Sequence, residues 1–109
     1  MANTFKLKTK ANVGVTTVGI YTAPAATTTV VIGITMANTS GSGVNVGVGI
    51  TRAGATEDIK LLKNAPLPQG SSLEFMAGNK VVLEATDTLT VDSDVNNSVD
   101  TALTIMEIT

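Results

Sequence analysis

The residues best suited to chemistry are oxygen-bearing side chains in the C-terminal part of the sequence. Asp92, Asp94 and Asn96 alternate along the chain, and Asp100 follows four positions after Asn96. This spacing begins many calcium-binding loops, because oxygen ligands at alternate positions can converge on one hard cation. The match then fails, since Asn97 stands where the loop needs glycine and its final bidentate glutamate is missing. These four residues are therefore candidates for a calcium site, and the alternative is an acidic hairpin turn.

The composition leaves few routes to enzymatic catalysis. The chain has no Cys and no His, which excludes thiol nucleophiles, imidazole bases and most transition-metal sites. Carboxylates that could act on a glycosidic bond occur at Glu57-Asp58 and at Glu74 with Glu84. No aromatic platform for a sugar accompanies them, because the only aromatic residues are two Phe and one Tyr. We therefore expect no catalytic residue and no cofactor, and hence no enzyme.

Alternation of apolar and polar residues predicts that strands position these side chains. The clearest case is 44–51, where Val44, Val46, Val48 and Ile50 are expected in the core. The full set of expected strands is 4–10, 17–22, 29–38, 44–51, 56–63, 72–76, 80–84, 88–93 and 100–109. Turns recur about every 8–12 residues, which is typical of an antiparallel sandwich or small barrel. We predict an all-β fold, a single antiparallel β-sandwich of jelly-roll or Ig-like type with eight or nine short strands.

Charge is absent from a long part of the sequence, Ala11–Thr51. Soluble proteins normally interleave charge on solvated surfaces, because a mostly apolar surface self-associates. Within this part, 29–38 is apolar on both predicted faces, with Ile32, Ile34 and Met36 expected on the same side. We therefore expect both faces of its strands to be covered, in part by other subunits.

Two regions are candidates for contact between subunits. Residues 1–12 are expected to form an extended N-terminal arm or edge strand, followed by a sandwich domain of residues 13–109. The second face of 44–51 is nearly bare, which suits flat packing against another chain or, alternatively, a bulged or strongly twisted strand. The predicted interface residues are Phe5, Lys6, Lys8, Lys10, Asn45, Gly47 and Gly49.

Charge is also divided unevenly between the two ends of the sequence. Lys6, Lys8 and Lys10 lie near the N-terminus, whereas residues 81–109 contain acidic residues and no Lys or Arg. The two ends could pair within one chain or between subunits, although exposed ion pairs contribute only about 0–1 kcal/mol. The net charge of −2 is too small to favour nucleic acid, and every candidate membrane span is interrupted by polar residues. We expect neither nucleic acid nor a membrane as partner.

Five stretches of the sequence carry a likeness to a known family. They are Ile20–Ala25, Thr28–Gly33, Leu61–Glu74, Lys80–Glu84 and Asp87–Val91. Together they resemble small β-sandwich structural proteins in the virions of tailed bacteriophages, notably those infecting marine bacteria and cyanobacteria. The resemblance covers nearly the whole chain and rests on turn and strand patterns. It implies many copies on a particle, and it brings no catalytic residues with it.

These observations predict a non-enzymatic virion structural protein, a capsid decoration (cement) protein that stabilises contacts between major capsid subunits. A neck, tail or fibre-attachment protein is the alternative within that class. A host-surface glycan-binding module is the alternative from another class, against which the shortage of aromatic residues argues. The expected partners are further copies of the chain, as a trimer, and the major capsid protein or other virion proteins. No apolar leader follows Met1, so we expect synthesis in the host cytoplasm and location in the virion.

Overall fold

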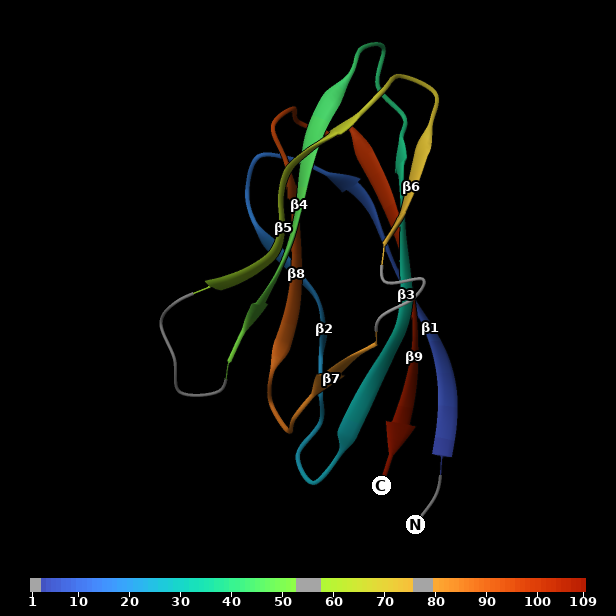
Figure 1. The fold of residues 1–109 in the computed structure, drawn as a ribbon, viewed down its shortest axis with the longest axis vertical. Coiled ribbons are helices and arrows are strands. Elements are labelled where there is room, and N and C mark those ends of the chain that lie inside the picture. The colour runs from blue at the N-terminus through green and yellow to red at the C-terminus, as the bar shows by residue number, and fades with distance from the viewer. Residues whose placement is uncertain (1–2, 53–57, 76–79) are drawn as a thin grey trace.

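The computed structural model describes residues 3–52, 58–75 and 80–109. Within them it contains nine strands and no helix, arranged as two antiparallel sheets packed face to face (Figure 1). The predicted all-β sandwich is therefore confirmed. The strands are β1 (Asn3–Val13), β2 (Val18–Thr22), β3 (Thr28–Asn38), β4 (Val44–Thr51), β5 (Asp58–Leu67), β6 (Ser72–Phe75), β7 (Val81–Leu83), β8 (Thr88–Ser93) and β9 (Val99–Ile108).

The strand order identifies the type of sandwich. Sheet A has the order β1-β9-β3-β6, and β7 also pairs with β3, whereas sheet B has the order β2-β8-β4-β5. β6 pairs with Ile34–Ala37 and β7 with Thr29–Val31, so the two short strands share one position beside β3. Each sheet thus has four positions, and strands from the two ends of the chain interleave as in two Greek keys. This is the jelly-roll arrangement, one of the two types that the sequence left open.

The core lies between the sheets and is built from aliphatic side chains. The side chains of Val44, Val46, Val48 and Ile50 are buried, as the alternation predicts. Leu103 and Ile105 supply the same layer from β9. Each fully buried Val, Leu or Ile contributes about 1.5–3 kcal/mol, so the core holds the sheets together with almost no aromatic residues.

β3 departs from the predicted pattern at Ile32. The pairing of β3 with β9 shifts register between Val31 and Gly33, which marks a β-bulge at the intervening residue. Val31 and Ile34 are both fully buried, whereas Ile32 is half-buried and lines a hollow on the outer side of sheet A. The prediction that Ile32 shares a face with Ile34 and Met36 is therefore wrong, because one extra residue reverses which side chains face the core.

β5 is longer than expected and includes a proline. The sequence predicts a strand over 56–63 and a turn from Pro66, but β5 runs from Asp58 through Pro66 to Leu67. Pro66 has no amide hydrogen to donate. It is tolerated because β5 is an edge strand, and on its outer side no neighbouring strand needs that hydrogen bond. The turn predicted at 77–79 lies outside the described residues.

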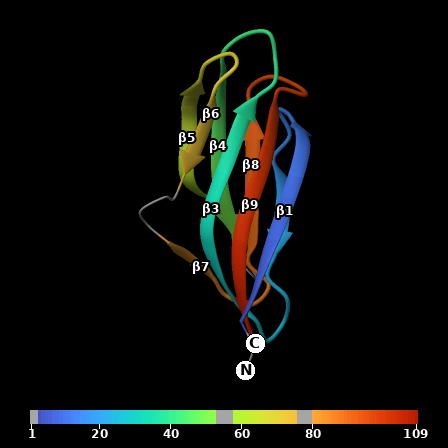
Figure 2. The same cartoon turned by 90° about the vertical axis from the view of Figure 1, so that its right-hand side faces the viewer.

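The N-terminal strand lies along the C-terminal one at the edge of sheet A (Figure 2). Asn3 is opposite Ile108 and Lys10 is opposite Thr101, in antiparallel register. The region expected as an arm or edge strand is thus paired with its own chain. Among the described residues there is no helix long and apolar enough to cross a membrane.

Candidate assembly surface

The four candidate calcium ligands do not converge. Asp94 and Asp100 each accept a hydrogen bond from a backbone amide of a neighbouring segment, at 2.9 and 3.0 Å. Asn96 accepts one from the Val15 amide at 3.5 Å, and Asp92 lies in an ion pair with Lys60. Each side chain therefore secures a different loop or strand. In the described part of the chain, no group of three or more acidic side chains could hold a metal ion.

The carboxylates considered for glycosidic chemistry are also separated. Glu74 is opposite Thr35 on β3, whereas Glu84 follows the β7 residue that pairs with Thr29 and forms an ion pair with Arg52. Glu57 lies outside the described residues. Glu74 and Glu84 therefore lie beside different ends of β3.

The glycine face of β4 is covered by the chain itself. Gly47 and Gly49 are buried. A Cβ atom added at Gly47 would lie 2.6 Å from Oδ1 of Asp92, and one at Gly49 would lie 2.8 Å from Oδ1 of Asp58. Such separations are shorter than any ordinary contact, so glycine is needed for these carboxylates to cross β4. The second face of β4, which the sequence shows as nearly bare, is therefore covered by the side chains of Asp92 and Asp58.

That cover is a network centred on Lys60. Its Nζ lies 2.8 Å from Oδ2 of Asp58 and 3.1 Å from Oδ2 of Asp92, and the hydroxyl of Thr90 donates to Asp58. Burial acts to raise the pKa of the Asp58 carboxyl, but the hydrogen bonds and the charge of Lys60 hold it below its ordinary value. The bond to Asp58 raises the pKa of Lys60. A contact of Asn45, Gly47 or Gly49 with another subunit stays a prediction, and such a subunit would meet these charged side chains.

The outer face of sheet A, by contrast, is open and apolar. Phe5, Leu7 and Val82 are 69%, 64% and 54% exposed. No described atom lies within 4 Å of a Cβ atom added at Gly33, near the centre of this face. We call this surface the apolar face, and its members are Phe5, Leu7, Thr9, Val30, Ile32, Gly33, Thr35, Val82, Ala102, Thr104 and Met106. It contains Phe5 from the predicted interface together with Leu7, which alternates with the lysines in the same way.

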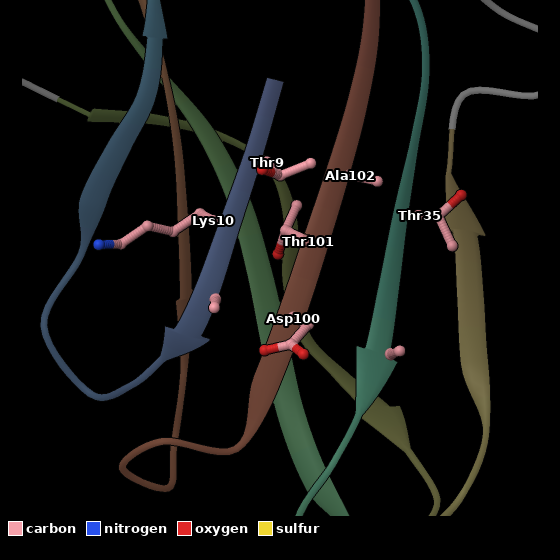
Figure 3. Close-up of a pocket in the computed structure, with 8 residues that line it drawn as sticks. Thr9, Lys10, Thr35, Asp100, Thr101 and Ala102 are labelled. Carbon is pink, nitrogen blue, oxygen red and sulfur yellow. The ribbon is translucent and has the colours of Figure 1, made fainter. Parts of the chain in front are cut away.

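The apolar face is not uniform along its strands. At one end the strand register places Phe5, Met106 and Val30 in one row. At the other end smaller residues leave a hollow of about 360 Å³. Figure 3 shows Thr9 on β1, Ala102 on β9 and Thr35 on β3 around this hollow. The central row between the two ends is Leu7, Thr104 and Gly33.

The basic side chains of β1 take the opposite side of the strand. Lys6 pairs in register with Ile105, a core residue, and its Nζ lies 2.9 Å from Oε1 of Glu107. The predicted pairing of the basic N-terminus with the acidic C-terminal region thus occurs within one chain. Inward-pointing charge on an edge strand discourages pairing with a further strand. The edge of β1 is therefore protected against pairing with another strand, whereas its outer face is apolar.

Glu107 also joins the two sheets. Tyr21 on β2 donates a hydrogen bond to Oε2 of Glu107 at 2.6 Å, and its hydroxyl lies 2.8 Å from Oγ1 of Thr29. The hydrogen bonds from Tyr21 and Lys6 lower the pKa of Glu107. Burial, followed by the bond to Glu107, raises the pKa of Tyr21 to about 12. This buried network fixes β1 and sheet A against sheet B at the end that carries Phe5.

Comparisons with known proteins give structural matches only. Neither the protein-family models nor the curated proteins yield a match. A chain of the Bacillus endospore appendages, described as a family of disulfide-linked pili, matches with a TM-score of 0.59 at 14% identity, over 99% of this chain and 87% of that one. A chain of the Helicobacter pylori bacteriophage KHP30 capsid matches with a TM-score of 0.58 at 11% identity, over 98% and 87%.

A third match is to a larger chain. A chain of the T13 viral particle of IBDV matches with a TM-score of 0.59 at 12% identity, over 96% of this chain and 30% of that one. These identities are too low to show more than a shared fold. The fold of this chain is thus also found in subunits of two virus particles and of a pilus.

Proposed function

We propose that this protein is a non-enzymatic structural subunit of a virus particle and that it contacts neighbouring subunits through the apolar face. This proposal rests mainly on the exposure of Phe5 and Leu7 on a sheet face whose rows from Phe5 to Thr9 carry no charged residue on β1, β9 or β3. Exposed apolar patches of this kind mark interaction sites. The fold shared with the two virus-particle chains supports a virion structural role.

Within that class we propose a capsid decoration (cement) protein that binds across boundaries between major capsid subunits. Burial of apolar surface contributes about 25 cal/mol per Å², so docking alone strengthens such a boundary. The separated carboxylates fit this role, because docking needs no reactive group. On this proposal the protein is made in the host cytoplasm and located in the virion.

Quantitative mass spectrometry of particles purified from the source of this sequence tests the proposal. Copy numbers comparable to that of the major shell protein, with density on the shell in a cryo-electron microscopy map, are expected. A few copies per particle would instead place the protein at a neck, tail or fibre. Absence from the particles would overturn the virion role.

A filament subunit is the second candidate, because the Bacillus pilus chain matches over nearly the whole length of this one. A covalent linkage through disulfides is excluded for this chain, which contains no cysteine. Negative-stain electron microscopy of the concentrated protein separates the two candidates. Long filaments would favour the pilus-like role, and discrete particles would favour the virion role.

A glycan-binding module is the candidate from another class, since jelly rolls also occur in lectin domains. Binding of the purified protein to a glycan array, with loss of that binding when free sugar is added, would favour it. We expect no such binding, because Phe5 is the one exposed aromatic side chain among the described residues and the sequence contains no Trp.

A further inference from the structure

We propose that the apolar face binds the apolar face of a second copy across a two-fold axis. The axis lies between sheet A of one copy and sheet A of the other. It runs parallel to both sheets and perpendicular to their strands, and it passes over the row of Leu7, Thr104 and Gly33. This dimer rests on the proposed function, because it assigns a partner to the same apolar face. The dimer and the virion role are tested by different experiments.

The strand register makes the apolar face complementary to itself. A two-fold axis over the central row reverses the strand direction of the second copy. The Phe5 row of one copy therefore lies over the Thr9 row of the other, and the central rows lie over each other. Phe5 then lies over Thr9, and Met106 lies over Ala102. Val30 correspondingly lies over Thr35. On β1 and β9 a large side chain meets a small one, as close packing of two surfaces requires, whereas on β3 the two side chains are similar in size.

The distribution of charge favours face-to-face pairing over strand addition. The rows from Phe5 to Thr9 contain no charged side chain on β1, β9 or β3, so the face has no pattern that selects an oppositely charged partner. The inward lysines of β1 protect the edge. Glu74 lies opposite Thr35, and with Lys80 it lines a hollow that also includes Gly33 and Thr104, so polar groups of both signs lie beside the β3 side of the face.

The outer side of sheet A is large enough for a small interface. Four strand positions about 4.8 Å apart and about ten residues of about 3.3 Å give on the order of 600 Å² for that whole side, and the rows from Phe5 to Thr9 make up about half of it. Specific interfaces bury about 800 Å² per partner once side-chain relief is included. Pairing would therefore cover most of the apolar surface that sheet A leaves exposed.

Chemical cross-linking tests the position of the axis. The chain contains no cysteine, so Thr104→Cys introduces a single thiol at the centre of the apolar face. Stacked sheets lie about 10 Å apart, which is too far for a direct disulfide and suits a bis-maleimide of that span. The matched control is Asn45→Cys on the outer side of sheet B. A covalent dimer is expected from Thr104→Cys and not from Asn45→Cys, and the reverse would overturn the proposal.

Charged substitutions at positions 5 and 9 test which residues of the two copies face each other. Phe5→Lys and Thr9→Glu should each raise the dimer dissociation constant at least about tenfold, measured by light scattering across a concentration series. The double variant should recover at least about tenfold at low salt, because each ammonium meets the carboxylate of the other copy. Residues 5 and 9 of one chain lie about 13 Å apart, so recovery cannot arise within a chain. A double variant weaker than both single variants would overturn the register.

The remaining outcomes separate dimer from virion role. A wild-type protein that is monomeric at millimolar concentration, with circular dichroism of a folded β protein, would overturn the dimer while leaving the particle measurements to judge the proposed function. A stable trimer without the Thr104→Cys cross-link would likewise overturn the two-fold axis. A cross-linked dimer that is absent from virions would leave the dimer standing and overturn the virion role.

Discussion

Tyr21 is the only tyrosine in a sequence without tryptophan, and its hydroxyl joins the two sheets through Glu107. Burial and the carboxylate raise the pKa of Tyr21 to about 12. We therefore expect the phenolate absorbance to develop near pH 12 rather than near 10. In Glu107→Gln the transition should move toward lower pH but stay above 10, because burial is the larger cause. A transition near 10 in the wild-type protein would contradict the buried network.

The carboxylate side of this network predicts the response to acid. The hydrogen bonds from Tyr21 and Lys6 lower the pKa of Glu107 below its ordinary value of 4.5, so they stabilise the fold above that pH. This stabilisation is lost as the pH falls through the lower, folded-state value. In urea unfolding, the wild-type advantage over Glu107→Gln should shrink from pH 7 to pH 3. A constant difference across this range would exclude a contribution from ionised Glu107.

Two glycines in different surroundings provide a matched comparison. A Cβ atom at Gly49 would lie 2.9 Å from the backbone oxygen of Ile59 as well as close to Asp58, whereas at Gly33 it would meet no described atom. Gly49→Ala should therefore lower the free energy of unfolding by about 1–3 kcal/mol. Gly33→Ala should change it by no more than about 0.5 kcal/mol. Urea unfolding measures both, and equal effects would contradict the cover over β4.

At the scale of elements, β1 combines an open face with a protected edge. Replacing Lys8 and Lys10 with Thr removes inward charge from this edge strand while keeping its β propensity. We expect increased aggregation, measured as turbidity against protein concentration, with little loss in the free energy of unfolding. The control replaces Lys8 and Lys10 with Arg, which keeps the inward charge, and should stay soluble. Equal turbidity in all three proteins would mean that the edge needs no protection.

The alternation of residue types made much of the sandwich predictable from the sequence. In 44–51 apolar residues occur at every second position without interruption, so the core positions of β4 follow directly. In 100–109 apolar residues occur on both faces, so the sequence does not show that Leu103 and Ile105, rather than Met106 and Ile108, face the core. β3 could not be assigned in this way, because the bulge at Ile32 depends on its pairing with β9 rather than on the residues of β3 themselves. The choice between jelly-roll and Ig-like order depends on distant strands and carries no local signal.

The candidate surface was predictable only in part for the same reason. Phe5 alternates with lysines, so its outward position follows from the sequence. The cover over Gly47 and Gly49 comes from β8 and β5, which lie beside β4 only in the folded sheet. The sequence therefore gives no indication that the side chains of Asp58 and Lys60 lie across β4.

At the scale of the whole molecule, salt dependence distinguishes the apolar face from a charged interface. Raising sodium chloride from about 0.1 to 1 M screens charges almost completely and leaves apolar burial intact. We therefore expect the light-scattering dissociation constant of the wild-type dimer to stay constant or fall. A rise of tenfold or more would mean that ion pairs hold the copies together and would point to the Lys60 side of the molecule.

The pairing of Asn3 with Ile108 brings the two described ends of the chain to one pole of the sandwich. Opposite residues in an antiparallel pair lie about 5 Å apart, so a short glycine-serine linker could close the backbone into a ring. The chain could then be reopened at another loop as a circular permutant. A peptide fused at either end would project from the same pole, and in the two-fold pair two such cargoes would point in opposite directions.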